Sequence, residues 1–252
     1  MTRVFKSCLE WMEFRKSLTG SSLGFVPTMG ALHDGHASLI RRSAAENDKT
    51  LLSIFVNPAQ FDDPKDLEQY PRTLEEDRRK AAQAGADFLL LPEASEIYSD
   101  KYRYQVAEKT FSKLLCGKNR PGHFEGVLTV VMKLLNIAAA DRAYFGEKDY
   151  QQFVLVRDMA KAFFMNTEII GLPTVRESDG LAMSSRNARL SKEERATAPG
   201  FYKILKTAAR EEEAFSALNH AGFECEYVID LDDRRFAAVR LGAVRLIDNV
   251  QR

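Results

Sequence analysis

The chain has 252 residues, 45% hydrophobic and 29% charged, enough for one large domain or for one medium and one small domain. Lysine plus arginine equals aspartate plus glutamate at 36 each, which argues against a dedicated nucleic-acid binder, since such proteins carry a basic excess. The first residues lack the apolar core of a signal peptide, and no run approaches the roughly 20 apolar residues of a membrane span. Three scattered cysteines suit a reducing compartment. We therefore expect a cytoplasmic protein with no membrane or nucleic-acid partner.

Five short runs are apolar throughout, as in the buried strands of a parallel sheet, and helical patterns lie between them. The strands are expected at residues 23–27, 50–56, 87–91, 142–145 and 167–172, and the helices at 35–47, 73–84, 123–139 and 149–165. Gly85 is a plausible C-cap of the second helix. Strands that alternate with helices indicate βαβ units. The predicted fold is α/β, with a Rossmann-like parallel five-stranded sheet in the order 3-2-1-4-5 over residues 1–175.

The pattern changes beyond about residue 175. A long helical stretch at 192–219, interrupted at Pro199 and Gly200, precedes short strand-like runs at 223–230, 236–240 and 243–247. We expect residues 176–252 to form a small α+β domain that acts as a lid over the nucleotide edge of the sheet.

A turn with two histidines follows the first predicted strand, where residues 27–36 read Pro-Thr-Met-Gly-Ala-Leu-His-Asp-Gly-His. A strand that feeds a helix in this way directs backbone N–H groups and the positive end of the helix dipole at one point. Gly30 and Gly35 let a large anion approach the backbone. His33 and His36 share a face and can donate to phosphate oxygens. The turn predicts a site for a nucleoside triphosphate.

Two other interpretations of the histidine pair are open. The spacing is compatible with a metal site, but zinc needs further ligands, and Cys8, Cys116 and Cys225 show no Cys-x-x-Cys spacing. The histidines can also be purely structural. The Gly-rich context favours phosphate chemistry.

Further polar segments follow the other strands, at the carboxyl edge where open α/β sheets bind ligands. Gly146-Glu147-Lys148-Asp149 is a second anion-facing turn, in which Lys148 suits a phosphate, and Asp149 suits either a helix N-cap or a ribose hydroxyl. In the later segment, Met183-Ser184-Ser185-Arg186 offers hydroxyls and a guanidinium group that can clamp phosphate oxygens, although alone it is a weak signal.

Two glutamines on the same edge, Gln60 and Gln152, suit a small substrate with hydroxyl and carboxylate groups. Residues 120–126 are either a helix cap or part of the site. Thr73 and Glu76 fit a capping box, and the neighbouring Asp77 is a candidate Mg²⁺ ligand beside the triphosphate.

These motifs together resemble the pantothenate synthetase (pantoate–β-alanine ligase) family, within the His-x-Gly-His nucleotidyltransferase and class I aminoacyl-tRNA synthetase-like superfamily. The resemblance covers residues 23–187 and reappears at 245–249. It is carried by Pro-Thr-Met-Gly-Ala-Leu-His-Asp-Gly-His, Phe-Val-Asn-Pro-Ala-Gln-Phe, Tyr-Pro-Arg-Thr, Arg-Pro-Gly-His-Phe-Glu-Gly-Val, Phe-Gly-Glu-Lys-Asp-Tyr-Gln-Gln, Asp-Gly-Leu-Ala-Met-Ser-Ser-Arg-Asn and Arg-Leu-Ile-Asp-Asn.

The resemblance implies that the carboxylate of pantoate attacks ATP to give pantoyl adenylate and pyrophosphate, and that β-alanine then displaces AMP. It implies catalytic roles for His36, as an acid-type catalyst, and for His33 and Lys148. It implies pantoate contacts for Gln60 and Gln152. The implied ATP contacts are Met29, Gly30, His33, His36, Gly146, Lys148, Asp149, Val175, Met183, Ser184, Ser185 and Arg186. It also implies Mg²⁺, a cytoplasmic location and a homodimer.

One departure from the family pattern is expected, because the stretch between Pro199-Gly200 and the final Arg-Leu-Ile-Asp-Asn looks shorter than usual. The alternative function is transfer of AMP or CMP to a phosphorylated substrate. Such an enzyme should offer Arg or Lys for a second phosphate where this chain has Gln60 and Gln152. A non-catalytic nucleotide- or RNA-binding module is a third interpretation, and the balanced charge argues against it.

Overall fold

The computed structural model describes residues 2–252, which form two compact units. The first unit comprises residues 2–146 and 151–172, and the second comprises residues 147–150 and 173–252. The boundary between the units differs from the predicted one after residue 175, because residues 147–150 and 173–175 group with the second unit. A lid role for the second unit stays a prediction.

The first unit is built on a parallel sheet of six strands in the order β1-β4-β3-β2-β5-β6. The strands are β1 (Arg3–Phe5), β2 (Leu23–Thr28), β3 (Lys49–Ile54), β4 (Phe88–Leu90), β5 (Arg142–Gly146) and β6 (Glu168–Leu172). The five predicted strands and their order are confirmed. The sheet has one strand more than predicted, the edge strand β1, whose three residues are too few to show a pattern.

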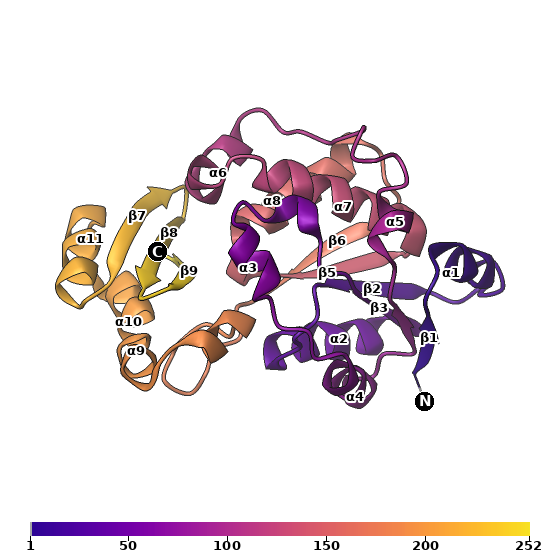
Figure 1. Cartoon of the computed structure of the whole chain (residues 1–252), viewed down its shortest axis with the longest axis horizontal. Coiled ribbons are helices and arrows are strands. Elements are labelled where there is room, and N and C mark those ends of the chain that lie inside the picture. The colour runs from indigo at the N-terminus through magenta and orange to yellow at the C-terminus, as the bar shows by residue number, and fades with distance from the viewer. Residues whose placement is uncertain (1) are drawn as a thin grey trace. The chain divides into compact units, whose positions relative to one another are not determined.

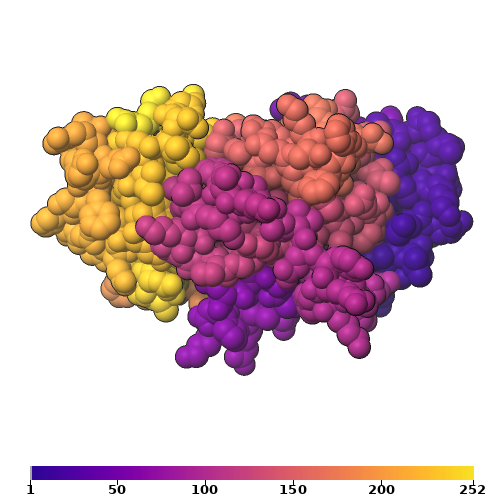
Figure 2. Space-filling view, turned by 90° about the horizontal axis from the view of Figure 1, so that it is seen from above, coloured from indigo at the N-terminus to yellow at the C-terminus, as the bar shows by residue number. Residues whose placement is uncertain are grey.

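Helices cover both faces of this sheet (Figure 1). They are α1 (Cys8–Arg15), α2 (Asp34–Glu46), α3 (Pro64–Glu68), α4 (Leu74–Ala84), α5 (Ala94–Ile97), α6 (Leu115–Asn119), α7 (His123–Ala138) and α8 (Tyr150–Ala162), with the 3₁₀ helices η1 (Pro58–Gln60) and η2 (Phe111–Lys113). Figure 1 shows α2 and α4 on one face and α7 and α8 on the other. The chain between α5 and α7, magenta in Figure 2, lies on the surface of the unit.

Close packing of α2 on the sheet explains the glycine in β2. A Cβ atom at Gly24 would lie 2.1 Å from the hydroxyl oxygen of Ser43 on α2. Val26, Leu52 and Ile40 are fully buried in the core beneath this helix. Burial of such side chains contributes roughly 1.5–3 kcal/mol each, so this layer holds the start of α2 firmly against the carboxyl end of β2. As predicted, Gly85 caps α4 in the left-handed conformation.

The second unit contains a three-stranded antiparallel sheet with helices packed on it. Its strands are β7 (Glu224–Leu231), β8 (Arg234–Leu241) and β9 (Val244–Gln251), and its helices are α9 (Lys192–Thr197), α10 (Pro199–Thr207) and α11 (Glu211–His220), with the 3₁₀ helices η3 (Glu147–Asp149) and η4 (Ser185–Arg189). The predicted interruption is confirmed, since α10 begins at Pro199. The core of the unit includes Phe201, Leu218 and Val239.

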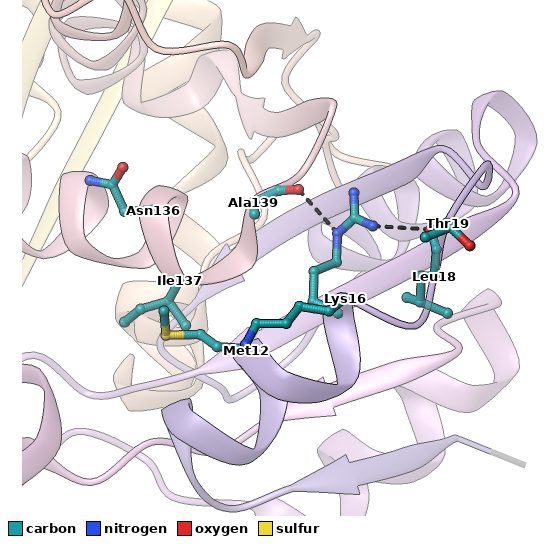
Figure 3. A pocket seen from close by; sticks show the side chains of 8 residues that line it. Met12, Lys16, Leu18, Thr19, Asn136, Ile137 and Ala139 are labelled. Atoms are coloured by element: carbon teal, nitrogen blue, oxygen red, sulfur yellow. Dashed lines mark hydrogen bonds between the residues drawn. The ribbon is translucent and has the colours of Figure 1, made fainter.

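A hollow of about 320 Å³ lies in the first unit, away from the predicted site residues (Figure 3). It is lined by Met12, Arg15, Lys16, Leu18, Thr19, Asn136, Ile137 and Ala139. Residues 18 and 19 precede β2, and residues 136–139 precede β5, so the hollow lies at the amino ends of the strands. The motifs lie at the opposite ends. Among the described residues, no helix is both long and apolar enough to cross a membrane.

Candidate active site

The turn after β2 has the backbone conformation that its glycine allows. Gly30 adopts φ +80° and Ala31 adopts φ +50°, so the chain passes through the left-handed region at two successive residues. The hydroxyl oxygen of Thr28 accepts the N–H of Gly30 at 3.2 Å and its hydroxyl donates to the carbonyl of Ser53 at 2.7 Å. A side chain at position 30 would press on Asp77 and Ile54, each 3.0 Å from the added Cβ. The turn therefore requires glycine.

Asp77 on α4 binds the backbone of this turn. Its carboxylate is 2% exposed and accepts the N–H of Ala31 at 3.0 Å and the N–H of Leu32 at 2.7 Å. Lys80, one turn further along α4, donates to the carbonyl of Leu32 at 2.7 Å. The hydroxyl of Thr73 donates to Asp77 rather than capping the helix, so the predicted capping box of Thr73 and Glu76 is wrong. Both carboxylate oxygens of Asp77 are thus engaged by the turn.

His33 and His36 form a capping box at the start of α2. Nδ1 of His33 accepts the N–H of Gly35 at 3.2 Å, and Nδ1 of His36 accepts the N–H of His33 at 3.4 Å. An Nδ1 that accepts a hydrogen bond places the proton of a neutral imidazole on Nε2. The ring centroids lie 4.1 Å apart. In a neutral ring of either histidine, Nε2 is therefore the donor, and both rings lie at the amino end of α2, where the helix dipole favours anions.

Gln60 reaches the same turn from the segment after β3. Its Nε2 lies 3.0 Å from the Sδ of Met29, and its Oε1 accepts from Nδ2 of Asn57 at 3.0 Å. Asn57 is the N-cap of η1 and is 1% exposed. The structure therefore brings Gln60 together with the turn that carries the two histidines.

Residues 120–126 support Gln60 instead of serving only as a helix cap. Arg120 and His123 both contact the main-chain carbonyl of Gln60, at 3.1 and 2.8 Å. Arg120 also pairs with Asp62 at 2.6 Å. Burial raises the pKa of that carboxyl, but the bond and charge of Arg120, a backbone hydrogen bond and the charge of His123 together outweigh burial, and the net shift of the pKa is downward. Gly126 permits close packing, since a Cβ there would lie 2.2 Å from the carbonyl oxygen of Ala59.

Gln152 lies in the first turn of α8, half-buried, after β5. Strands β3 and β5 flank β2, so the segments that carry Gln60 and Gln152 follow strands on either side of the histidine turn, as predicted. The neighbouring Gln151 has a structural role: its amide bonds the backbone of Phe111, Leu114 and Cys116.

In the second unit, Lys148 and Asp149 lie in η3 and are held by the last strand. Nδ2 of Asn249 donates to the carbonyls of Glu147 at 2.8 Å and of Lys148 at 3.0 Å. Arg234 pairs with Glu147 at 2.9 Å and donates to Oδ1 of Asn249 at 2.7 Å. The turn that carries Lys148 therefore depends on a buried asparagine about a hundred residues further along the chain.

The segment with Val175 and Met183 is held by the residue next to Asn249. The N–H of Met183 donates to the carbonyl of Val175 at 3.0 Å. Between them, Arg176 forms a two-pronged ion pair with Asp248, at 2.6 and 2.9 Å. Ser184 then caps η4 by accepting the N–H of Arg186, and Ser185 is the first residue of that helix.

Sequence reasoning did not single out Asn57, Asp248 and Asn249, which are 4% exposed or less. Their signal was present, because each belongs to a motif that carries the family resemblance. The metal interpretation of the histidine pair gains no support: among the described residues, no group of three or more His, Cys, Asp or Glu side chains is arranged to hold a metal ion.

Comparisons with known proteins agree with this geometry. The family model of Pantoate-beta-alanine ligase matches residues 3–251. A pantothenate synthetase of Bdellovibrio bacteriovorus is 51% identical over 251 residues, which cover 100% of both chains. The structure of a pantoate-beta-alanine ligase from Francisella tularensis, complexed with beta-gamma ATP and beta-alanine, superposes with a TM-score of 0.96 at 42% identity, covering 100% of this chain and 98% of that one.

The structure of pantothenate synthetase from Thermus thermophilus has a TM-score of 0.90 at 39% identity, and each chain is covered to 99%. Compared with these relatives, the chain shows no shortening near the C-terminus, since the matches extend over nearly the whole of each relative's chain. The expected shortening relative to the usual length in the family stays a prediction. The full-length match to the family model and the identity of about one residue in two establish that this chain belongs to the pantoate-beta-alanine ligase family.

Proposed function

We propose that this protein condenses pantoate with β-alanine to form pantothenate, at the expense of ATP. The observation that carries the proposal is the pair of imidazole rings of His33 and His36, held through Nδ1 at the amino end of α2, beside a turn that is contacted by the amide of Gln60. Such an arrangement suits a phosphate group next to a small polar substrate. Membership of the ligase family supports the choice of substrates.

The reaction has two steps in this proposal. A carboxylate oxygen of pantoate attacks the α-phosphorus of ATP, the bond from that phosphorus to the bridging oxygen breaks, and pyrophosphate leaves. The amine of β-alanine then attacks the acyl carbon of pantoyl adenylate, loses a proton, and AMP leaves as the amide forms. The first step gathers negative charge on phosphate oxygens, so donors fixed before the reaction lower its barrier.

Individual roles are assigned on the same basis. His36, as acid-type catalyst, and His33 donate to phosphate oxygens, and Lys148 supplies a compact cation. Gln60 and Gln152 bind pantoate. The remaining proposed ATP contacts are Met29, Gly30, Gly146, Asp149, Val175, Met183, Ser184, Ser185 and Arg186.

Mg²⁺ normally accompanies a reacting nucleoside triphosphate, and we keep it in the proposal as a companion of ATP. Asp77 does not fit as its ligand, because both oxygens of its buried carboxylate accept backbone N–H groups of the turn. No step of the mechanism is therefore assigned to a protein-bound metal ion.

A cytoplasmic location and a homodimer complete the proposal. Among the described residues, Cys8, Cys116 and Cys225 form no disulfide bond, which suits a reducing compartment. The homodimer rests on the family resemblance, and sedimentation of the purified protein tests it.

Pyrophosphate release from ATP tests the proposed activity. Pantoate alone should release about one equivalent per active site as the adenylate accumulates, and addition of β-alanine should give continuous turnover with pantothenate and AMP as products. Absence of pyrophosphate release, or release that does not depend on pantoate, would refute the assignment. The alternative of nucleotide transfer to a phosphorylated substrate predicts release only with such a substrate.

A further inference from the structure

A buried tyrosine is connected through Asn57 to Gln60, the glutamine that we propose binds pantoate. Tyr98 is the C-cap of α5 and is 5% exposed, and its hydroxyl lies 2.5 Å from Oδ1 of Asn57. Asn57 in turn contacts the side chain of Gln60 at 3.0 Å. Three polar groups thus form a chain that starts at Tyr98 and ends at the amide that faces Met29.

The direction of every hydrogen bond in this chain follows from the backbone. Oδ1 of Asn57 accepts the N–H of Ala59 at 3.3 Å, and its Nδ2 donates to the carbonyl of Gly126 at 3.2 Å. A backbone N–H can only donate and a carbonyl can only accept, so the amide of Asn57 has one permitted orientation. The hydroxyl of Tyr98 must therefore be the donor to Oδ1. Nδ2 of Asn57 must likewise be the donor to Oε1 of Gln60.

Gln60 is left with a defined polarity. Its Oε1 is taken by Asn57, and its Nε2 faces the thioether of Met29 at 3.0 Å. A thioether is only a weak acceptor, so a substrate oxygen is a better partner for this N–H group. If the amide turned over, two N–H groups would meet at Asn57 and the bond between the two side chains would be lost.

The ring of Tyr98 is itself held in place. Nζ of Lys133 lies 4.8 Å from its ring centroid and donates to the carbonyl of Ile97 at 2.8 Å and to Asp100 at 2.7 Å. The ring of Tyr102 stacks on it at a centroid distance of 4.1 Å. Burial raises the pKa of Tyr98 well above its ordinary value, so the hydroxyl keeps its proton at neutral pH. Tyr98 is thus a permanent, immobilised donor.

We propose that Tyr98 is a positioning residue of the pantoate pocket, which acts through Asn57 to make Gln60 a hydrogen-bond donor and never an acceptor toward the substrate. The inference rests on the proposed role of Gln60 in binding pantoate. It specifies that the substrate atom opposite Gln60 is an oxygen that accepts, either of the carboxylate or of a hydroxyl group. An analogue with a donor-only group at that atom is excluded, because two N–H groups would face each other.

Tyr98→Phe removes the hydroxyl and leaves the ring. We expect the KM for pantoate to rise about three- to tenfold, the loss expected for one net hydrogen bond, while the KM values for ATP and β-alanine stay within about twofold. Tyr144→Phe is the matched control. Tyr144 is also buried in the first unit, and its hydroxyl bonds Asn47 and Glu46 at the C-terminal end of α2. This control should leave the KM for pantoate unchanged.

A double-mutant cycle separates positioning from general destabilisation. In a Gln60→Ala background, Tyr98→Phe should cause no further change in the KM for pantoate, because the group through which it acts is gone. Effects that multiply in the double variant, or an unchanged KM in Tyr98→Phe, would overturn the relay. Wild-type protein that makes no pantothenate would instead refute the proposed function.

The wild-type protein offers a test that does not depend on any variant folding. Neutron diffraction of crystals grown with pantoate in D₂O should show the deuteron of Tyr98 directed at Oδ1 of Asn57. It should also show both deuterons of Gln60 on the atom that faces away from Asn57. Deuterons of Gln60 directed at Asn57 would overturn the proposal.

Discussion

The rings of His33 and His36 lie 4.1 Å apart, and both use Nδ1 to accept backbone N–H groups at the start of α2. The bonds that cap the helix also fix which nitrogen of each neutral ring carries the proton. The two Nε2–H groups are oriented before any ligand arrives, and fixed donors are the kind that stabilise a transition state without reorganisation.

His36→Ala should lower kcat far more than it raises the KM for ATP, since the lost donor matters most as charge develops on phosphorus. Loss of one such donor typically costs about 2.7–4 kcal/mol, or roughly 10²–10³ in rate. Pre-steady-state pyrophosphate release measures the step. His220→Ala, at an exposed position on α11, is the control and should behave as wild type. Near-normal turnover of the His36 variant would remove His36 from the mechanism.

Gln60→Ala should raise the KM for pantoate and leave the KM for ATP almost unchanged. A substrate oxygen left without its partner costs about 1–3 kcal/mol, or about 5- to 150-fold in affinity. Initial rates with each substrate varied in turn give both constants. The exposed Gln83 on α4 provides the control substitution Gln83→Ala. If the two KM values rise equally, Gln60 belongs to the nucleotide site and the assignment of the pocket is wrong.

Asp77→Asn should destabilise the turn without altering the dependence on Mg²⁺. An amide offers one oxygen where the carboxylate offers two, so one N–H of Ala31 or Leu32 loses its partner, at a cost of about 1–3 kcal/mol. Thermal unfolding measures this loss, and Glu75→Gln, exposed on the same helix, is the control. A rise in the Mg²⁺ concentration needed for half-maximal activity would show instead that Asp77 is a metal ligand.

Asn249→Ala should impair adenylate formation although the substituted residue is not one of the proposed ATP contacts. The carbonyls of Glu147 and Lys148 lose their donor, so the turn that carries Lys148 loosens. Each of the two lost hydrogen bonds is worth about 0.5–1.5 kcal/mol, and kcat/KM for ATP should fall by the corresponding factor.

Lys148→Ala is the comparison and Asn219→Ala, exposed on α11, is the control. Use of pre-formed pantoyl adenylate should bypass the defect of both the Asn249 and the Lys148 variants. A defect confined to the second step would contradict the role given to Lys148.

Glu108 lies in the segment before η2, and we expect its ionised carboxyl to stabilise the folded protein against acid. Burial would raise the pKa of this carboxyl, but bonds from Thr110 and Ser112 outweigh it and lower the pKa to about 2. Because the folded pKa lies below the unfolded value, the stabilisation is complete above about pH 4.5 and is lost as the pH falls toward 2. Glu108→Gln should therefore lower the Tm at pH 7, and the difference from wild type should vanish near pH 2. A constant difference across this range would contradict the assignment.

Much of the fold could be predicted because local patterns encode it. The buried strands of the first unit are apolar on both faces, so their positions show in the sequence to within about two residues. Their alternation with helices implies parallel pairing, and the order was predicted from the Rossmann-like fold. Strand β1 was missed because three residues show no period. The capping box at Thr73 failed because its hydroxyl donates to Asp77, one turn further along the same helix, whose carboxylate is fixed by the backbone N–H groups of Ala31 and Leu32.

The sequence by itself determined which chemical groups are present. It also indicated which edge of the sheet receives the histidine turn and the segments with Gln60 and Lys148, since these follow β2, β3 and β5. The tertiary structure decided how those groups are oriented. Tyr98 and Asn57 are 41 residues apart, and Asn249 is about a hundred residues from the turn it holds. A hydrogen bond needs its partners within about 3 Å and at the right angle, and contacts over such separations arise only when the packed core brings the segments together. The same packing determines the polarity of Gln60 and the nitrogen that carries the proton in each histidine.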